Sequence, residues 1–125
     1  MMNKERPRHL ALHLIKLPLP GVVSILHRIS GLLLFLMLPL LLVMLQYSLL
    51  SIETYTQLVG VLQNPVIKLI LLGLGWAFFH HFCAGIRYLA IDLDFGVGLA
   101  PAQVTSRLVL IAGLSLTVLL GAWLW

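Results

Sequence analysis

Two groups of polar side chains lie inside apolar stretches of this sequence, where they could do chemistry. The first group is Ser24, His27 and Arg28 with the small residue Gly31. These residues fall on one side of a helix, because positions three and four apart are neighbours there. That side offers a hydroxyl, an imidazole and a guanidinium, and a guanidinium binds carboxylates through paired hydrogen bonds. The simpler interpretation is a basic cap at a membrane interface that only sets the orientation of the chain.

The second group is the adjacent pair His80 and His81. Consecutive helical residues point about 100° apart, so the two imidazoles should face different neighbours. On the side of His81 lie Gly73, Ala77 and Gly85, small residues that let a flat ligand approach the backbone. Haem iron accepts axial imidazole, which makes His81 the candidate ligand on this side. The alternative is a structural histidine that makes a hydrogen bond between helices.

Ligation of a single iron by two histidines of this chain is unattractive. His80 and His81 cannot occupy opposite sides of one iron within a continuous helix. From its position in the sequence, His27 is expected nearer the cytoplasmic surface than His81. A second axial ligand would therefore have to come from another chain.

The composition indicates that membrane helices position these residues. The chain has 125 residues, of which 61% are apolar and 10% charged, whereas soluble domains carry about 25% charged residues. The mean hydropathy of +1.07 also excludes a disordered chain. The net charge of +4 is too small and too scattered to indicate nucleic-acid binding. The single cysteine, Cys83, excludes an internal disulfide and a metal site built only from thiolates of this chain.

Stretches of about 20 apolar residues predict membrane-spanning helices. The run 32–38 shows no alternation, which argues against barrel strands. Pro39 should kink the first helix, and the connection 51–64 should be a short external loop. We therefore expect an all-α integral membrane protein with a single domain, 1–125. The predicted helices cover about 22–50, 65–91 and 106–125.

The basic residues predict the orientation of the chain. All of the 8 basic residues except Lys68 lie before or at the start of the first helix, or near the connection between the second and third. Basic residues favour the cytoplasmic side, so the N-terminus should be cytoplasmic. Trp123 and Trp125 would lie at the far interface. The seven residues on the cytoplasmic side are Lys4, Arg6, Arg8, Lys16, Arg28, Arg87 and Arg107.

The basic start of the chain has neither a small-residue cleavage site nor a serine-rich presequence. We therefore expect a retained first helix in a bacterial inner (cytoplasmic) membrane. Three helices form a thin bundle whose polar face needs covering, which predicts a partner subunit.

Two motifs resemble those of a known family. The second motif is the segment 81–92, which is similar to a signature of the form H-x-x-x-G-I-R-H-x-x-x-D. The first motif lies within residues 6–31. Together they resemble the cytochrome b subunit of succinate dehydrogenase, the larger of two small membrane anchors of respiratory complex II. The resemblance covers nearly the whole chain. The first motif comprises Arg6-Pro7, His9-Leu10, Leu17-Pro18 and Ser24-Ile25-Leu26-His27-Arg28-Ile29-Ser30-Gly31.

The resemblance implies a b-type haem held between two anchors, with one axial histidine from each. His81 matches the ligand position, and His80 beside it is the alternative ligand. Ser24 and Arg28 match positions of the quinone pocket, while His27 and Arg28 match positions close to the haem propionates. Tyr88 stands where the family often has a second histidine.

The resemblance also implies the partners and the reaction. A second small anchor, an iron–sulfur subunit and a flavoprotein subunit would complete a succinate:quinone oxidoreductase that passes electrons from succinate to ubiquinone. This chain would not be catalytic alone, because succinate oxidation occurs on the partner subunits. The rival interpretations are the anchor of a related fumarate reductase, and a non-redox assembly subunit in which His81 is structural and Arg28 topological.

Overall fold

The computed structural model describes residues 16–125, and this part of the chain is helical with short connections. Three of its helices are long and apolar enough to cross a membrane, which confirms the predicted all-α membrane fold. Lys4, Arg6, Arg8 and the start of the first family motif lie outside the described residues. The helices are α1 (Leu19–Leu50), α2 (Ile52–Leu62), α3 (Pro65–Asp92) and α4 (Leu99–Leu124).

The predicted start of the third membrane helix, residue 106, is wrong. Helix α4 begins at Leu99, with Gly98 as its N-cap residue and Pro101 in its first turn. Proline is tolerated there because the N–H groups of the first turn have no partner within the helix. The polar residues before position 106 are therefore helical, and they include groups that contact α3.

The predicted external loop 51–64 is largely the amphipathic helix α2. The side chain of Ser51 accepts a hydrogen bond from the backbone N–H of Thr54, and Thr54 Oγ1 accepts one from the Ser51 N–H at 3.0 Å. This reciprocal capping box stabilises the start of a helix. Tyr47 Oη also donates to Gln57 Oε1 at 2.6 Å, which ties α2 to the end of α1.

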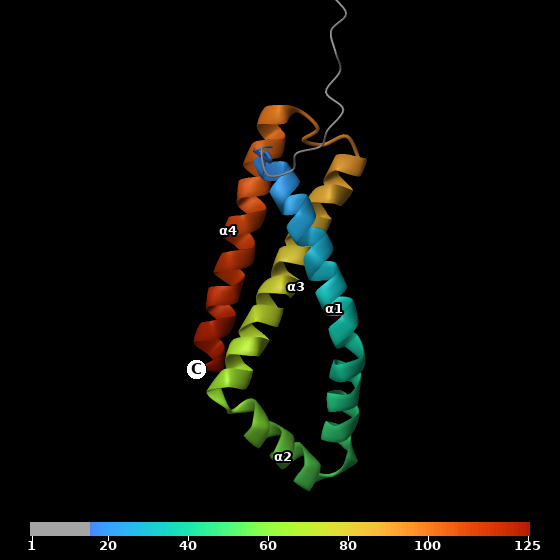
Figure 1. Ribbon diagram of the computed structural model, residues 1–125, viewed down its shortest axis with the longest axis vertical. Coiled ribbons are helices and arrows are strands. Elements are labelled where there is room, and N and C mark those ends of the chain that lie inside the picture. The colour runs from blue at the N-terminus through green and yellow to red at the C-terminus, as the bar shows by residue number, and fades with distance from the viewer. Residues whose placement is uncertain (1–15) are drawn as a thin grey trace, which may run out of the picture.

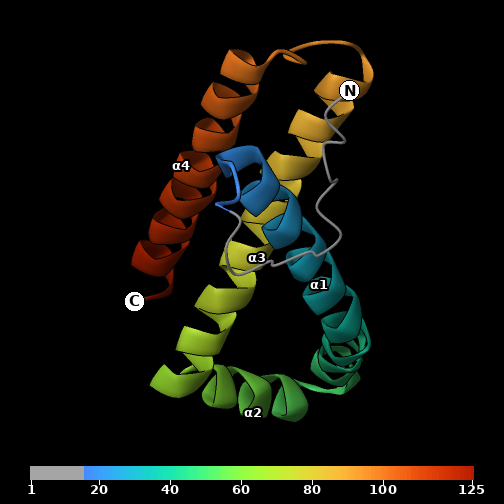
Figure 2. The same cartoon turned by 45° about the horizontal axis from the view of Figure 1, so that its top comes forward.

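The three long helices pack together at one end of the molecule. Toward the other end α1 diverges from α3, while α3 and α4 stay in contact. Figure 1 shows the start of α1, the end of α3 and the start of α4 at that packed end, and both Figures 1 and 2 show α1 and α3 crossing and then diverging toward α2. Val23, Ala84 and Val109, one from each helix, form the small apolar core. The buried residues of α1, Val23 and Ser30, both lie in its first half. The second half of α1 therefore faces lipid or another chain.

Helices α3 and α4 pack closely because small residues lie between them. A Cβ atom built on Gly113 would stand 3.3 Å from Cα of His80, so α4 contacts the backbone of α3 directly. At the opposite end of this pair, Lys68 Nζ donates to the Leu124 carbonyl at 2.8 Å and lies over the Trp125 ring. Lys68 is thus separated from the basic residues of the packed end, as the charge pattern predicts.

Candidate functional site

The imidazoles of His27 on α1 and His81 on α3 stack on each other. Their ring centroids are 4.1 Å apart, and their planes differ by 7°. The prediction that His27 lies nearer the surface than His81 is wrong, because α1 and α3 cross at this point and positions counted along a helix ignore its tilt. Stacked rings at this distance leave no room for a planar macrocycle between them, so His27 does not supply the second axial ligand.

The hydrogen bonds of His81 determine which of its ring nitrogens carries the proton. Its Nδ1 lies 3.0 Å from the carbonyl oxygen of His27, and since a carbonyl only accepts, Nδ1–H is the donor. Ser30 Oγ donates to the same carbonyl at 2.9 Å and lies 3.4 Å from Nδ1. In a neutral ring this leaves Nε2 with a free lone pair.

The Nε2 atom of His81 remains available to a ligand. It makes no hydrogen bond with residues 16–125, and it is not one of their buried unpaired atoms. Gly31 lets the ring lie against α1, because a Cβ built on Gly31 would stand 2.7 Å from Cε1 of His81. We call the three residues of α1 that hold this ring, His27, Ser30 and Gly31, the His81 seat.

His80 occupies the interior of the helix bundle. It is 0% exposed, and both of its ring nitrogens are buried without a partner in the described chain. The backbone of Gly113 lies against it, and Trp76 stacks on its ring at 5.3 Å. A ligand could reach this imidazole only if α3 and α4 separated. The geometry therefore favours His81 over His80 for binding a group from outside the chain.

The small-residue stripe predicted beside His81 does not form one surface. Ala77 is buried on the side of α3 that also buries His80, whereas nothing lies within 4 Å of a Cβ built on Gly73. Gly85 keeps its predicted place, since its Cβ would stand 3.8 Å from Nε2 of His27. The surface beside His81 is thus made largely by α1, not by α3 alone.

The predicted polar face of α1 is divided in the structure. His27 and Gly31 contact His81, while Arg28 is exposed and Ser24 is partly exposed. Neither Ser24 nor Arg28 makes a side-chain hydrogen bond within residues 16–125. They lie one turn apart on the flank of the His81 seat, where a ligand from outside the chain could use both.

The contacts of the Tyr88 and Arg87 side chains were not predicted from the sequence. The ring of Tyr88 lies 5.1 Å from that of His27, and its hydroxyl is buried without a partner among the described residues. Arg87, whose charge also serves as an orientation signal, is 7% exposed and donates from Nε to Thr105 Oγ1 at 3.0 Å. The available signal was its spacing from His80 and Ala84, which places all three on one helix face.

Known proteins resemble this chain over nearly its full length. A family described as "Succinate dehydrogenase/Fumarate reductase transmembrane subunit" matches residues 2–122. A Coxiella burnetii protein named "Succinate dehydrogenase cytochrome b556 subunit" is 36% identical over 99% of this chain and 100% of its own length. Proteins of the same name from Rickettsia felis and Rickettsia conorii are 31% and 32% identical, each over 93% of this chain and 90% of its own.

Proposed function

The chain belongs to the succinate dehydrogenase/fumarate reductase transmembrane subunit family, and from that premise we propose that it is the cytochrome b anchor of a succinate dehydrogenase complex. The relatives named above are all called succinate dehydrogenase subunits, which favours this enzyme over fumarate reductase. Their bacterial sources support a location in a bacterial inner membrane. The chain is a multi-pass membrane subunit of the enzyme and is not catalytic alone.

His81 is the proposed axial ligand of haem b, through Nε2. The observation that carries this proposal is the hydrogen bond from His81 Nδ1 to the His27 carbonyl, because in a neutral ring it leaves the lone pair of Nε2 free for a ligand. A ligand histidine usually donates its other ring N–H in this way, which fixes the ring and raises its basicity. When bound, haem b supplies a redox centre that holds one electron near the quinone. A histidine of a second small anchor would help hold the haem from the other side.

Ser24 and Arg28 are the proposed quinone contacts. The Ser24 hydroxyl can donate a hydrogen bond to a quinone carbonyl, and the exposed guanidinium of Arg28 can offset negative charge that develops on that oxygen. Arginine does not give up its proton, so the protons for ubiquinone must arrive through water or through partner residues. His27 and Arg28, next to the His81 seat, are the proposed neighbours of the haem propionates.

The remaining partners follow from this assignment. Arg28, Arg87 and Arg107 mark the packed end as the cytoplasmic end, where an iron–sulfur subunit and a flavoprotein subunit would dock. Electrons from succinate would pass through those subunits to ubiquinone. The apolar surface of the long helices is exposed and would contact the second anchor and lipid.

A reduced-minus-oxidised spectrum of the affinity-purified complex tests the haem assignment. We expect a b-type band in the wild-type complex, loss of that band in His81→Ala, and its retention in His80→Leu, the neighbouring imidazole. Co-purification of the partner subunits shows that each variant assembles. A band that survives in His81→Ala, or no band in the wild type, would contradict the proposal; the latter would favour a non-redox assembly subunit.

The quinone assignment has a separate test. In Arg28→Ala we expect ubiquinone reduction by succinate to fall, while succinate oxidation with a soluble electron acceptor stays intact. Arg107→Ala is the matched control, because Arg107 is also an exposed arginine at the packed end but lies on α4. Unchanged ubiquinone turnover in Arg28→Ala would count against a role in the quinone site.

A further inference from the structure

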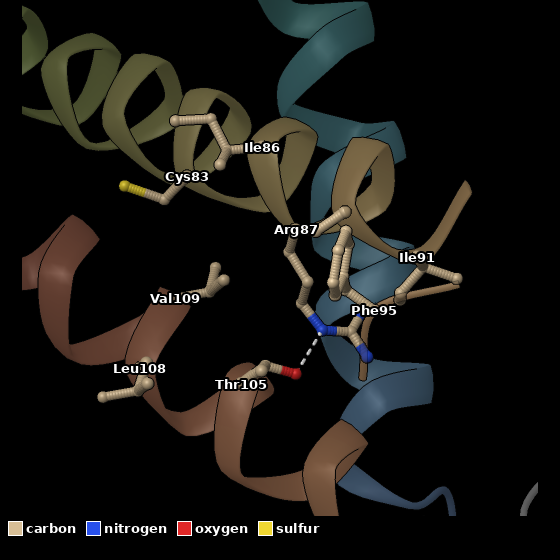
Figure 3. A pocket seen from close by; sticks show the side chains of 9 residues that line it. Cys83, Ile86, Arg87, Ile91, Phe95, Thr105, Leu108 and Val109 are labelled. Atoms are coloured by element: carbon tan, nitrogen blue, oxygen red, sulfur yellow. Dashed lines mark hydrogen bonds between the residues drawn. The ribbon is translucent and has the colours of Figure 1, made fainter. Parts of the chain in front are cut away.

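A cavity of about 210 Å³ lies between α3 and α4 near the packed end of the molecule. Figure 3 shows Arg87 and Thr105 on its polar side and Ile86, Leu108 and Phe95 among its apolar walls. On α3, the cavity residues Cys83 and Ala90 stand about 160–180° around the helix from His81, and Arg87 stands about 120° from it. The cavity between α3 and α4 is therefore directed away from the side of α3 on which His81 meets α1.

Arg87 brings a buried positive charge to this cavity without a matching negative one. Its hydrogen-bond acceptors are neutral: Thr105 Oγ1 at 3.0 Å from Nε, and the Ala102 carbonyl at 3.5 Å from Nη2. No carboxylate of residues 16–125 pairs with it. A guanidinium carries five N–H donors, so most of them lack a partner, and a buried charge is costly unless it is paired.

The position of Arg87 along α3 places it at the depth of lipid headgroups. Helix α3 has 28 residues and is about 42 Å long, so it extends about 6 Å beyond each side of a hydrocarbon layer of about 30 Å. Arg87 precedes the end of α3 at Asp92 by five residues, or about 7.5 Å. Its guanidinium thus lies close to the boundary where lipid phosphates are found.

We propose that this cavity binds an anionic phospholipid, with Arg87 holding the phosphate and the apolar walls holding the start of an acyl chain. A guanidinium matches the paired oxygens of a phosphate, and Thr105 fixes the orientation of its fork. The walls lie open on the outside of the bundle, since Ile86 is 53%, Leu108 58% and Phe95 69% exposed. Free phosphate would gain nothing from these walls.

A carboxylate of the second anchor is the competing partner for Arg87. That anchor would approach Nε2 of His81 to help hold the haem, whereas Arg87 stands about 120° around α3 from His81. This expected position of the second anchor rests on the proposed function. The unpaired charge, the depth and the apolar walls do not depend on it.

Lipid retention by the intact complex tests the proposal. The complex is reconstituted in an equal mixture of phosphatidylcholine and phosphatidylglycerol, exchanged into a neutral detergent, and analysed by native mass spectrometry. We expect the wild type to retain phosphatidylglycerol and Arg87→Gln to retain it about tenfold less or lower, because charge-assisted hydrogen bonds are lost. Arg107→Gln is the matched control and should retain it like the wild type, since Arg107 is exposed and does not line the cavity.

A second variant keeps the charge and fills the space. Leu108→Trp should block the cavity and lower retention while Arg87 remains, which covers the case that Arg87→Gln fails to assemble. Three results would overturn the proposal: no retention by the wild type, full retention in both cavity variants, or a partner carboxylate paired with Arg87 in the assembled complex. Inorganic phosphate added to the delipidated complex should not raise its Tm; a rise equal to that with phosphatidylglycerol would assign the site to free phosphate instead.

Discussion

Gly31 of α1 faces the imidazole of His81 on α3 so closely that a Cβ atom on Gly31 would stand 2.7 Å from Cε1 and 3.1 Å from Nδ1. Side chains essentially never approach each other that closely. The ring can therefore lie on α1 only because residue 31 has no side chain. The orientation of the proposed haem ligand depends on a glycine in another helix.

Gly31→Ala should displace the His81 ring and lower the haem content of the complex several-fold. The added methyl has no space, and overpacking of this kind costs about 1–3 kcal/mol. Haem per complex, measured from the spectrum, and the electron paramagnetic resonance signal of the oxidised haem report the change. Gly73→Ala is the control, because nothing lies within 4 Å of a Cβ at Gly73. Normal haem content and an unchanged signal in Gly31→Ala would show that the ring is not held by this contact.

Ser30→Ala should loosen the hold on His81 without removing the ligand. Ser30 Oγ donates to the carbonyl that also accepts from His81 Nδ1, so its loss frees that carbonyl and the imidazole to shift. Loss of such supporting groups typically costs about 10–100-fold in metal affinity. We expect faster haem loss in detergent and a shifted midpoint potential. Ser115→Ala, on the exposed side of α4, is the matched control. Equal rates of haem loss and equal midpoint potentials in the two variants would argue against the role of Ser30.

Gly113→Ala should weaken the packing of α3 against α4. Its Cβ would stand 3.3 Å from Cα and 3.4 Å from the backbone nitrogen of His80, and the backbone cannot move aside as a side chain can. We expect a loss of about 1–2 kcal/mol in stability, seen as a lower Tm of the complex. Gly60→Ala in α2 should not lower the Tm, since its Cβ meets nothing within 4 Å and alanine favours helix. An unchanged Tm in Gly113→Ala would mean that the two helices adjust their separation freely.

Lys68→Met should loosen the last turn of α4. The variant loses the hydrogen bond from Nζ to the Leu124 carbonyl and the contact with the Trp125 ring, which together are worth about 1–2 kcal/mol. Backbone amides of the last turn, measured by hydrogen exchange, should exchange faster, whereas those around Val109 should not change. Equal protection of the last turn in both proteins would contradict this contribution of Lys68.

The three membrane helices were predictable because hydropathy over about 20 residues is a strong signal. Helix α2 and the first turns of α4 were not, because both are short stretches in which polar and apolar residues are mixed. Each does carry a local helix-start signal: Ser51 with Thr54 for α2, and Gly98 with Pro101 for α4. Hydropathy alone overlooks such signals, since they depend on backbone hydrogen bonds at helix ends.

The candidate site was predictable in its residue types and not in its arrangement. His81 was singled out from its place among small residues, yet the groups that hold it belong to α1. Spacing along one helix cannot show which residues of another helix lie opposite. The contacts of Ser30 and Gly31 with His81, and the depth of His27, therefore became visible only from the way in which α1 and α3 cross in the structure. The contact of Arg87 could not be predicted for the same reason, because its partner Thr105 lies on α4.

Where α1 crosses α3, the contact between Gly31 and His81 is the point about which α1 would rotate relative to α3. We call the part of α1 from Gly31 to Leu50 its arm. From Gly31 to Leu50 the arm is about 28 Å long, so a rotation of about 10° at the crossing moves its tip by about 5 Å. The arm contributes no buried residue of its own, and within the described residues its far end is tied to α2 by the Tyr47–Gln57 hydrogen bond. A subunit that packs along this arm and changes its angle would therefore also move the surface of α1 on which the His81 imidazole lies.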